Sequence, residues 1–347
     1  MPISKINKTN IALIPKSNQP SKMADFRPIS LCNTTYKLIS KVLANRLKLI
    51  LSSIITENQS ALIPGRLISD NILIAFEFMH YLNHKNEGKE SYMSIKLDMS
   101  KAFDRVEWNF IYEVMIKMGF AKKWVDLIMN CISSVSYLVI INGEACGNIT
   151  PTRGIRQGDP LSPYLFLLCA EGLSALFHKA ARDKQINGIA IGRGCPSLTH
   201  LFFTDDSLFF CKASVQECQH LVDILSRYEA TSGQKINTDK SSVFFRPNTP
   251  QERKECILNI LGPMQDSRHY KYLGLPSIIG KTKALVFAEV KERVAKKLAG
   301  WKGKLLSIGG REILIKAVAQ AVPTYTMSCF QLPKTLCKDL ENLMRNF

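Results

Sequence analysis

The chain has 347 residues, enough for about two or three domains or one multi-lobed domain, and 46% of them are hydrophobic, as in a globular protein. Lysine and arginine outnumber aspartate and glutamate by 46 to 29, so the net charge of +17 indicates a polyanionic partner. The ten cysteines form no C-x-x-C motif, the N-terminus is polar, and no apolar run approaches the about 20 residues of a membrane span. We therefore expect a soluble intracellular protein, nuclear or cytoplasmic, with reduced thiols, no structural zinc and no membrane contact.

Two apolar segments near the N-terminus, residues 10–16 and 25–30, predict a pair of strands. Lys16 and Arg27 follow apolar residues, a setting in which a long cationic side chain can extend toward a phosphate. Both could equally be ordinary surface cations.

Apolar residues at helical spacing predict a helix from Thr34 or Thr35 to about Ser53, and its lysines are either solvated or follow the phosphates of a nucleic acid. A Pro-Gly loop and a helix over 70–81 come next, followed by a polar connector over 83–90.

A short strand ends at Asp98, immediately before a helical stretch, and active sites gather at such strand ends. Helices are predicted over 108–118 and 122–133. Asn142-Gly143 then predicts a hairpin with a type I′ turn over 137–149.

The stretch from Arg153 to Pro163 holds the sequence Arg-Gln-Gly-Asp-Pro. Gly158 allows the backbone to approach a ligand closely, and Gln157 can hydrogen-bond a nucleotide or a template base. Ser162 as N-cap and Pro163 at the first helical position predict a long apolar helix to about Ala181.

Two adjacent carboxylates, Asp205 and Asp206, interrupt an otherwise apolar run from Leu201 to Phe210. The run predicts two strands buried on both faces and joined by a tight turn over 204–207. Two neighbouring charges in such a place stay ionised only beside a strongly positive group, for which Mg²⁺ or Mn²⁺ is the natural candidate. Together with Asp98, this pair can hold two ions about 3.5–4 Å apart, the arrangement used for nucleotidyl transfer.

The C-terminal third is expected to be largely helical and basic. An amphipathic helix over 215–231 ends at Gly233 and covers the sheet, and Lys240 follows in a loop. Ten lysines and arginines stand against three glutamates between residues 280 and 320, on helices expected over 285–299 and 311–321 that would grip duplex phosphates. Arg311, after two glycines, either contacts a phosphate or belongs to a helix-boundary turn.

In this order, the strand ending at Asp98, the Arg-Gln-Gly-Asp-Pro stretch and the Asp205-Asp206 hairpin resemble the reverse transcriptase domain of non-LTR (LINE-type) retrotransposons, in the form common in plant genomes. The resemblance covers nearly the whole chain. Thr204 departs from the family, which usually carries alanine before the two acids, but threonine is small enough that we expect metal binding to be retained.

The resemblance implies a role for each matching residue. Asp98, Asp205 and Asp206 would be the catalytic residues that hold two Mg²⁺ or Mn²⁺ ions. The residues expected to contact the incoming nucleotide are Lys16, Arg27, Phe103, Gln157, Gly158 and Lys240. Of these, Phe103 would reject a 2′-hydroxyl. Lys240 would either protonate the pyrophosphate or be merely solvated. The hairpin at 269–276 would grip the primer and template through Tyr272, Leu273 and Gly274, with Arg311 nearby in the thumb. A structural role is favoured for Asp104.

The resemblance also implies an α+β, right-hand polymerase fold with fingers, a ferredoxin-like palm (an antiparallel sheet plus helices) and a partial helical thumb. We expect fingers over 1–90 and 105–157, palm over 91–104 and 158–275, and a truncated thumb over 276–347. Its partners would be an RNA template, a DNA primer or target, and dNTPs.

Three functions stay open at this point. The first is RNA-directed DNA polymerase activity. The second is that of a catalytically inactive remnant that binds nucleic acid. This function stays open because we expect the chain to be either a fragment of a longer element, lacking its endonuclease and RNase H, or a degenerate copy. The third is that of a protein related to group II intron maturases.

Overall fold

The structure, a computed structural model, describes residues 3–84, 90–267, 271–280, 283–300 and 306–347. Contacts within the chain divide it into two units, one of residues 1–67 with 85–268 and the other of residues 68–84 with 269–347. Each unit combines helices with strands, and the expected α+β class is confirmed. The expected boundaries of fingers, palm and thumb stay a prediction.

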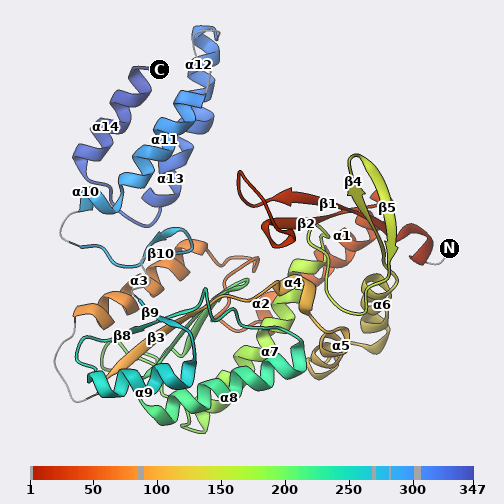
Figure 1. Ribbon diagram of the computed structural model, residues 1–347, viewed down its shortest axis with the longest axis horizontal. Helices are drawn as coiled ribbons and strands as arrows, with labels where there is room; N and C mark the ends of the chain where they lie inside the picture. The colour runs from red at the N-terminus through yellow and green to blue at the C-terminus, as the bar shows by residue number, and fades with distance from the viewer. Residues whose placement is uncertain (1–2, 85–89, 268–270, 281–282, 301–305) are drawn as a thin grey trace. The chain divides into compact units, whose positions relative to one another are not determined.

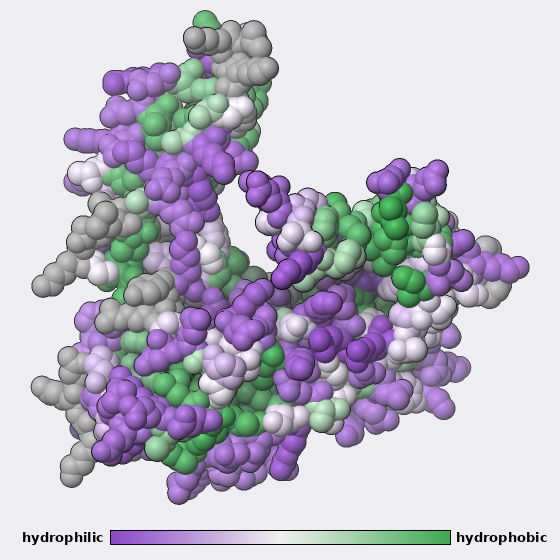
Figure 2. Space-filling model, in the orientation of Figure 1, coloured by the Kyte–Doolittle hydropathy of each residue, from purple (hydrophilic) through white to green (hydrophobic). Residues whose placement is uncertain are grey.

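The first unit contains a four-stranded sheet in the order β2-β1-β4-β5 (Figure 1). Its strands are β1 (Lys8–Pro15), β2 (Phe26–Cys32), β4 (Ser136–Ile141) and β5 (Glu144–Ile149). Asn142 and Gly143 both have positive φ angles, 52° and 88°, as a type I′ turn requires, so this predicted hairpin is confirmed. Figure 2 shows hydrophobic side chains on this hairpin, where Ile141 and Ile149 are 53% and 50% exposed.

A five-stranded sheet, in the order β6-β7-β3-β8-β9, forms the other part of the first unit. Its strands are β3 (Tyr92–Leu97), β6 (His200–Phe203), β7 (Asp206–Lys212), β8 (Ser242–Phe245) and β9 (Gln265–Asp266). The pairs β6-β7, β7-β3 and β3-β8 are antiparallel as expected, whereas the edge strand β9 pairs parallel with β8. Apolar side chains of the sheet share one core with α7 (Ser162–Arg182), α8 (Val215–Ser232) and α9 (Gln251–Leu261).

Two predicted helix starts are wrong. Asn33, not a threonine, caps α1 (Thr34–Lys48), because its Oδ1 accepts the Thr35 N–H at 2.9 Å, and the helix stops before a separate short helix, α2 (Leu51–Ile54). Ser162 lies inside α7 rather than capping it. Asp159 Oδ1 accepts the Leu161 N–H at 3.0 Å and thereby takes over the role of an N-terminal acceptor.

The helix α9 was not predicted, whereas three other helices of the first unit lie where the pattern placed them, to within a residue or two. They are α5 (Trp108–Lys117) and α6 (Lys122–Ser133), preceded by the short α4 (Ala102–Arg105), and α8, which ends at Gly233 with φ of 73°. Two 3₁₀ turns, η1 (Ile3–Ile6) and η2 (Met23–Asp25), precede β1 and β2.

The second unit is mainly helical around one apolar core. Its elements are α3 (Ile68–His84), β10 (Lys271–Tyr272), β11 (Leu275–Pro276), α10 (Lys283–Val286), α11 (Ala288–Gly300), α12 (Ile308–Leu314), the π-helical turn η4 (Ile315–Ala319), α13 (Ala321–Met327) and α14 (Lys334–Arg345). The helix expected over 311–321 is therefore divided, and α14 was not predicted. None of the described helices has the length together with the apolar character needed to cross a membrane.

Candidate active site

A two-residue turn carries the adjacent acids. Phe203 of β6 pairs with Asp206 of β7, so the turn consists of Thr204 and Asp205 alone and Asp206 belongs to the strand. The four-residue turn predicted from composition is therefore too long. Thr204 has a φ of 53°, which is rare for a β-branched residue and marks local strain.

Asp98 directly follows β3, the strand that pairs with β7 beside this turn. In the antiparallel ladder between β3 and β7, Leu97 is opposite Ser207, and the same register places the next residue, Asp98, opposite Asp206. Directly opposed residues have Cβ atoms about 4.5–5.5 Å apart. The backbone of Asp98 is held by the 237–241 loop, since its N–H donates to Ser241 Oγ at 3.2 Å and its carbonyl accepts the Asn237 N–H at 2.8 Å.

Asp206 lies in surroundings that disfavour its negative charge, so a nearby cation would stabilise its ionised form. Burial raises the pKa of Asp206 above its ordinary value; Lys96 opposes this effect, and the charges of Asp205 and Asp98 add to it. Like charges opposed on neighbouring strands repel each other, and a divalent cation between them would reverse that repulsion.

The described residues contain no group of three or more His, Cys, Asp or Glu side chains arranged as a metal cage. Asp98, Asp205 and Asp206 are among these residues, so the structure does not bring the three predicted carboxylates together as a preformed metal cage. Mg²⁺ is usually held by one or two carboxylates together with water and substrate phosphates. Asp98, Asp205 and Asp206 offer only oxygen ligands, the type that this ion prefers. They fit an ion completed by a substrate rather than one enclosed by the protein.

Four of the predicted nucleotide-binding residues meet in one cavity of about 370 Å³. Lys16 and Arg27 reach it from the β1–β2 hairpin, Phe103 from α4, and Gln157 from the loop before α7; Asp205 also lines it. A cavity lined by two cations and by an acidic turn can accept a polyphosphate with bound metal.

Contacts with neighbouring residues hold two of these side chains in place. Lys16 Nζ donates to the Ala24 carbonyl at 2.7 Å, and the ring of Phe103 stacks on that of Phe166 with centroids 5.1 Å apart. Asp104 also lines the cavity, where desolvation raises its pKa and Lys101 and Lys16 act in the opposite direction. The favoured structural role of Asp104 stays a prediction.

Gly158 and Lys240 do not line this cavity. The backbone of Gly158, with φ of 106°, lies against β2, where an added Cβ would be 2.9 Å from the Ser30 carbonyl oxygen. Lys240 is exposed in the loop that holds Asp98. Their contacts with a nucleotide stay predictions.

A buried polar cluster on both sides of Gln157 in the chain was not predicted from the sequence. Arg156 forms an ion pair of 2.8 Å with Asp159, the Tyr36 hydroxyl donates to the same carboxylate at 2.9 Å, and the guanidinium lies 4.0 Å from the centre of the Tyr36 ring. The only signal in the sequence was the i, i+3 spacing of opposite charges, which does not reveal burial.

The predicted primer and template residues belong to the second unit. Tyr272 Oη donates to Asn71 Oδ1 at 3.1 Å, and the hairpin turn consists of Leu273 and Gly274, with φ of 49° and 78°. Arg311, on α12, donates to the carbonyl of Phe347 at 3.4 Å. The start of the predicted hairpin, residues 269 and 270, lies outside the described residues.

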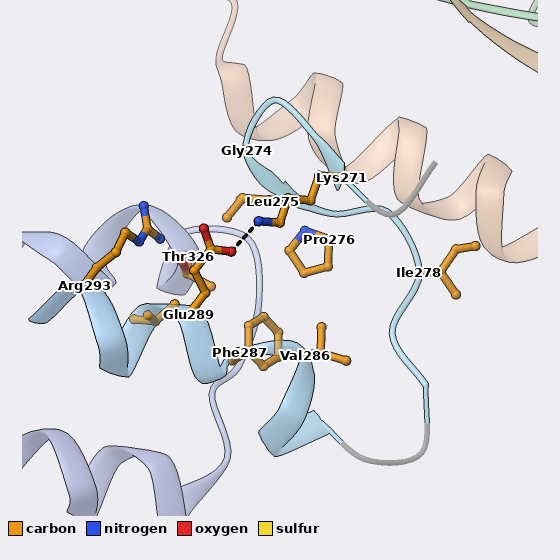
Figure 3. Close-up of a pocket in the computed structure, with 11 residues that line it drawn as sticks. Lys271, Gly274, Leu275, Pro276, Ile278, Val286, Phe287, Glu289, Arg293 and Thr326 are labelled. Carbon is orange, nitrogen blue, oxygen red and sulfur yellow. Dashed lines mark hydrogen bonds and ion pairs between the residues drawn. The ribbon is translucent and has the colours of Figure 1, made fainter. Parts of the chain in front are cut away.

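A cavity of about 180 Å³ lies beside this hairpin. Figure 3 shows Pro276 across the cavity from Phe287 and Val286, with an ion pair between Lys271 and Glu289 at its edge. Its lining is mainly apolar, unlike that of the cavity beside Asp205.

Residues 14–277 match the family model "Reverse transcriptase (RNA-dependent DNA polymerase)". The chain is 27% identical over 345 residues to the transposon TX1 uncharacterized 149 kDa protein of Xenopus laevis (97% of this chain, 25% of the relative). It is 29% identical over 279 residues to the Pol polyprotein from the type-2 retrotransposable element R2DM of Drosophila melanogaster (78% and 25%). An uncharacterized mitochondrial protein of Arabidopsis thaliana is 51% identical over 70 residues (20% and 57%). The chain thus spans about a quarter of the length of the first and second of these relatives.

Proposed function

Because the chain belongs to the reverse transcriptase family and is a domain of the non-LTR, LINE-type kind, we propose that it extends a DNA primer with deoxynucleotides on an RNA template. The observation that carries the proposal is the register that sets Asp98 opposite Asp206, beside a turn whose Asp205 shares a cavity with Lys16 and Arg27. Acidic and basic groups around one cavity suit a metal-bound triphosphate.

In this proposal, Asp98, Asp205 and Asp206 hold two divalent ions, Mg²⁺ or Mn²⁺. When bound, such ions activate a primer 3′-hydroxyl and neutralise the charge of the transferred phosphate. Lys16 and Arg27 bind the triphosphate, for which charge-assisted hydrogen bonds are well suited.

The neighbouring side chains choose and position the nucleotide. Phe103 contacts the sugar and rejects a 2′-hydroxyl, Gln157 hydrogen-bonds the nucleotide, and Gly158 keeps the adjoining backbone close to β2. Lys240 protonates the pyrophosphate that leaves.

The proposal extends to the second unit and to the source of the chain. Tyr272, Leu273, Gly274 and Arg311 contact the primer and template, and the chain acts in the nucleus or the cytoplasm. The identity of 51% with a segment from Arabidopsis thaliana supports a plant-type element. The net charge of +17 supports a nucleic-acid partner.

Primer extension tests this function. Purified protein is given an RNA template with an annealed DNA primer, dNTPs and Mg²⁺, and we expect extension that disappears when Asp205→Asn and Asp206→Asn are combined. Asp126→Asn, on the exposed face of α6, is the matched control and should extend primers normally.

Two other outcomes would point to the other functions. Salt-sensitive RNA binding without any incorporation by the wild-type chain favours the inactive remnant. Binding to a structured intron RNA with assistance in splicing favours a relation to maturases.

A further inference from the structure

Gln59 connects a loop near the N-terminus to the turn that carries Asp205. Its side chain is buried, with 1% of the residue exposed. Its Oε1 accepts the Thr204 N–H at 3.2 Å and the Ala61 N–H at 3.0 Å. Thr204 is the first residue of the two-residue turn, so the contact bears directly on the acidic site.

The orientation of this amide follows from its partners. Both are backbone N–H groups, which only donate, so the oxygen of Gln59 must face them. The Nε2 atom on the other side is buried and has no hydrogen-bond partner among the described residues. A side chain enclosed in this way presents neither amide atom to a nucleic acid.

The loop that carries Gln59 is itself fixed to β6. The Phe202 N–H donates to the Asn58 carbonyl at 2.8 Å, and the Ser60 N–H donates to the Phe202 carbonyl at 3.3 Å, as an added strand would. Arg66 closes the loop from within, since its guanidinium donates to the carbonyls of Ile55 at 2.8 Å and Thr56 at 2.6 Å. Gln59 therefore reaches Thr204 from a rigid base.

Thr204 needs such support. Its φ of 53° is in the left-handed region, which a β-branched residue adopts only when its surroundings impose it. A different φ would move Asp205 and change the start of β7 at Asp206. The bond from Gln59 is a side-chain contact that reaches the backbone of Thr204 from outside the hairpin.

We propose that Gln59 is a positioning residue for the acidic turn: it holds Thr204 in the left-handed conformation and thereby keeps Asp205 and Asp206 in place for metal binding. The consequence for metal binding rests on the proposed function, whereas the consequence for the turn does not. Glycine adopts positive φ without strain, so a glycine at position 204 should make the turn much less dependent on Gln59.

The test compares Gln59→Met, which keeps the length of the side chain and removes the acceptor, in the wild-type chain and in a Thr204→Gly background. Amide hydrogen exchange over residues 203–207, without metal or nucleic acid, reports on the turn itself. Loss of one hydrogen bond of this kind should speed exchange about tenfold in the wild-type background, and much less in the Thr204→Gly background. Gln234→Met is the matched control: Gln234 is also buried, but it donates to the Ala102 carbonyl, and its loss should leave exchange at 203–207 unchanged.

Mn²⁺ binding, followed by electron paramagnetic resonance, reports on the metal site. We expect Gln59→Met to raise the half-saturating Mn²⁺ concentration about tenfold and to leave RNA affinity unchanged. Unchanged exchange with weakened RNA binding would make Gln59 a template contact and overturn the proposal, as would equal effects in the two backgrounds. If Gln59→Met alone does not fold, recovery of folding on adding Thr204→Gly supports the proposal and continued failure overturns it. A wild-type chain that never extends primers refutes the polymerase function, and the exchange comparison still decides the role of Gln59.

Discussion

Arg156 and Asp159 form an ion pair whose side chains are 2% and 1% exposed, and Gln157 and Gly158 lie between them in the chain. The same segment is joined to β2, because the Ser30 N–H donates to the Gln157 carbonyl at 2.7 Å. The buried pair thus closes a short loop that presents Gln157 to the cavity beside Asp205. Side chains that never reach the cavity determine where one of its walls lies.

Breaking this pair should strongly destabilise the fold. Asp159→Asn leaves the Arg156 charge buried without its partner, and losses of about 3–5 kcal/mol are typical of such changes. Urea denaturation measures the free energy of unfolding. Glu312→Gln, which breaks the exposed pair with Lys316, is the control and should leave the free energy of unfolding nearly unchanged, because water screens an exposed pair. Equal losses in the two variants would show that the Arg156–Asp159 pair is not buried in solution.

Gly158→Ala should be more harmful than the same change at Gly143. Both glycines have positive φ, 106° and 88°, but only at Gly158 would the new Cβ meet a fixed atom, the Ser30 carbonyl oxygen at 2.9 Å. Gly143 has open space around it, so its substitution should cost about 1 kcal/mol from backbone strain alone. Gly158→Ala should cost more and also raise KM for dNTPs, since Gln157 must shift. Thermal unfolding and steady-state primer extension measure the two effects.

Much of the fold was predictable because its signals are local. The Asn142-Gly143 turn and the helices α5, α6 and α8 follow from residues that are neighbours in sequence. The strands β8 and β9 were missed because each is short and gains its place only by pairing with distant partners. The caps of α1 and α7 were misjudged because Asn33 and Asp159 competed successfully with the hydroxyls that the pattern favoured.

The residues of the candidate site likewise fall into those that the sequence made recognisable and those that it did not. Asp98, Asp205 and Asp206 stand out because three acids in apolar surroundings are costly without a partner. Gln59 and Arg156 carry no such signal, since their importance lies in the buried acceptors and donors that they meet only after folding.

Phe103→Val should relax the choice of sugar. If the ring excludes a 2′-hydroxyl, removing most of it should raise kcat/KM for ribonucleotides relative to deoxynucleotides by about 10- to 100-fold, the range expected for steric discrimination of this size. Phe120→Val is the matched control, because Phe120 packs against the same core but does not line the cavity beside Asp205. An unchanged ratio in the Phe103 variant would assign the ring to the core alone, through its stacking on Phe166.

Lys16→Ala and Arg27→Ala should each raise KM for dNTPs more than they lower kcat. Each variant removes a charge-assisted contact to the triphosphate, and such contacts are worth about 1.5–3 kcal/mol, or roughly 10- to 100-fold in affinity. Lys22→Ala changes an exposed cation that does not line the cavity and should leave KM unchanged. Similar effects of all three substitutions would indicate a general influence of net charge rather than contacts with the nucleotide.

His200 should make the folded chain sensitive to acid. This histidine is fully buried. Its Nε2 atom lies 2.9 Å from Ser174 Oγ, and its Nδ1 atom lies 2.8 Å from Thr199 Oγ1. Burial, reinforced by the nearby charge of His178, lowers the pKa of His200 from 6.5 to about 3. The folded state therefore keeps this ring neutral under conditions in which the unfolded chain binds a proton.

The sign of the effect follows from proton uptake on unfolding. Above the unfolded pKa of 6.5 neither state is protonated at His200, and the stabilisation by the neutral ring is fully present. As the pH falls from 6.5 to about 3, only the unfolded state gains the proton, so the free energy of unfolding should fall by up to about 1.4 kcal/mol per pH unit. His200→Gln keeps a hydrogen-bonding side chain but cannot titrate, and urea denaturation across this range should show a shallower slope. His220→Gln, on α8, should keep the wild-type slope. A slope in His200→Gln equal to that of the wild type would mean that the ring takes up its proton in the folded state as readily as in the unfolded one.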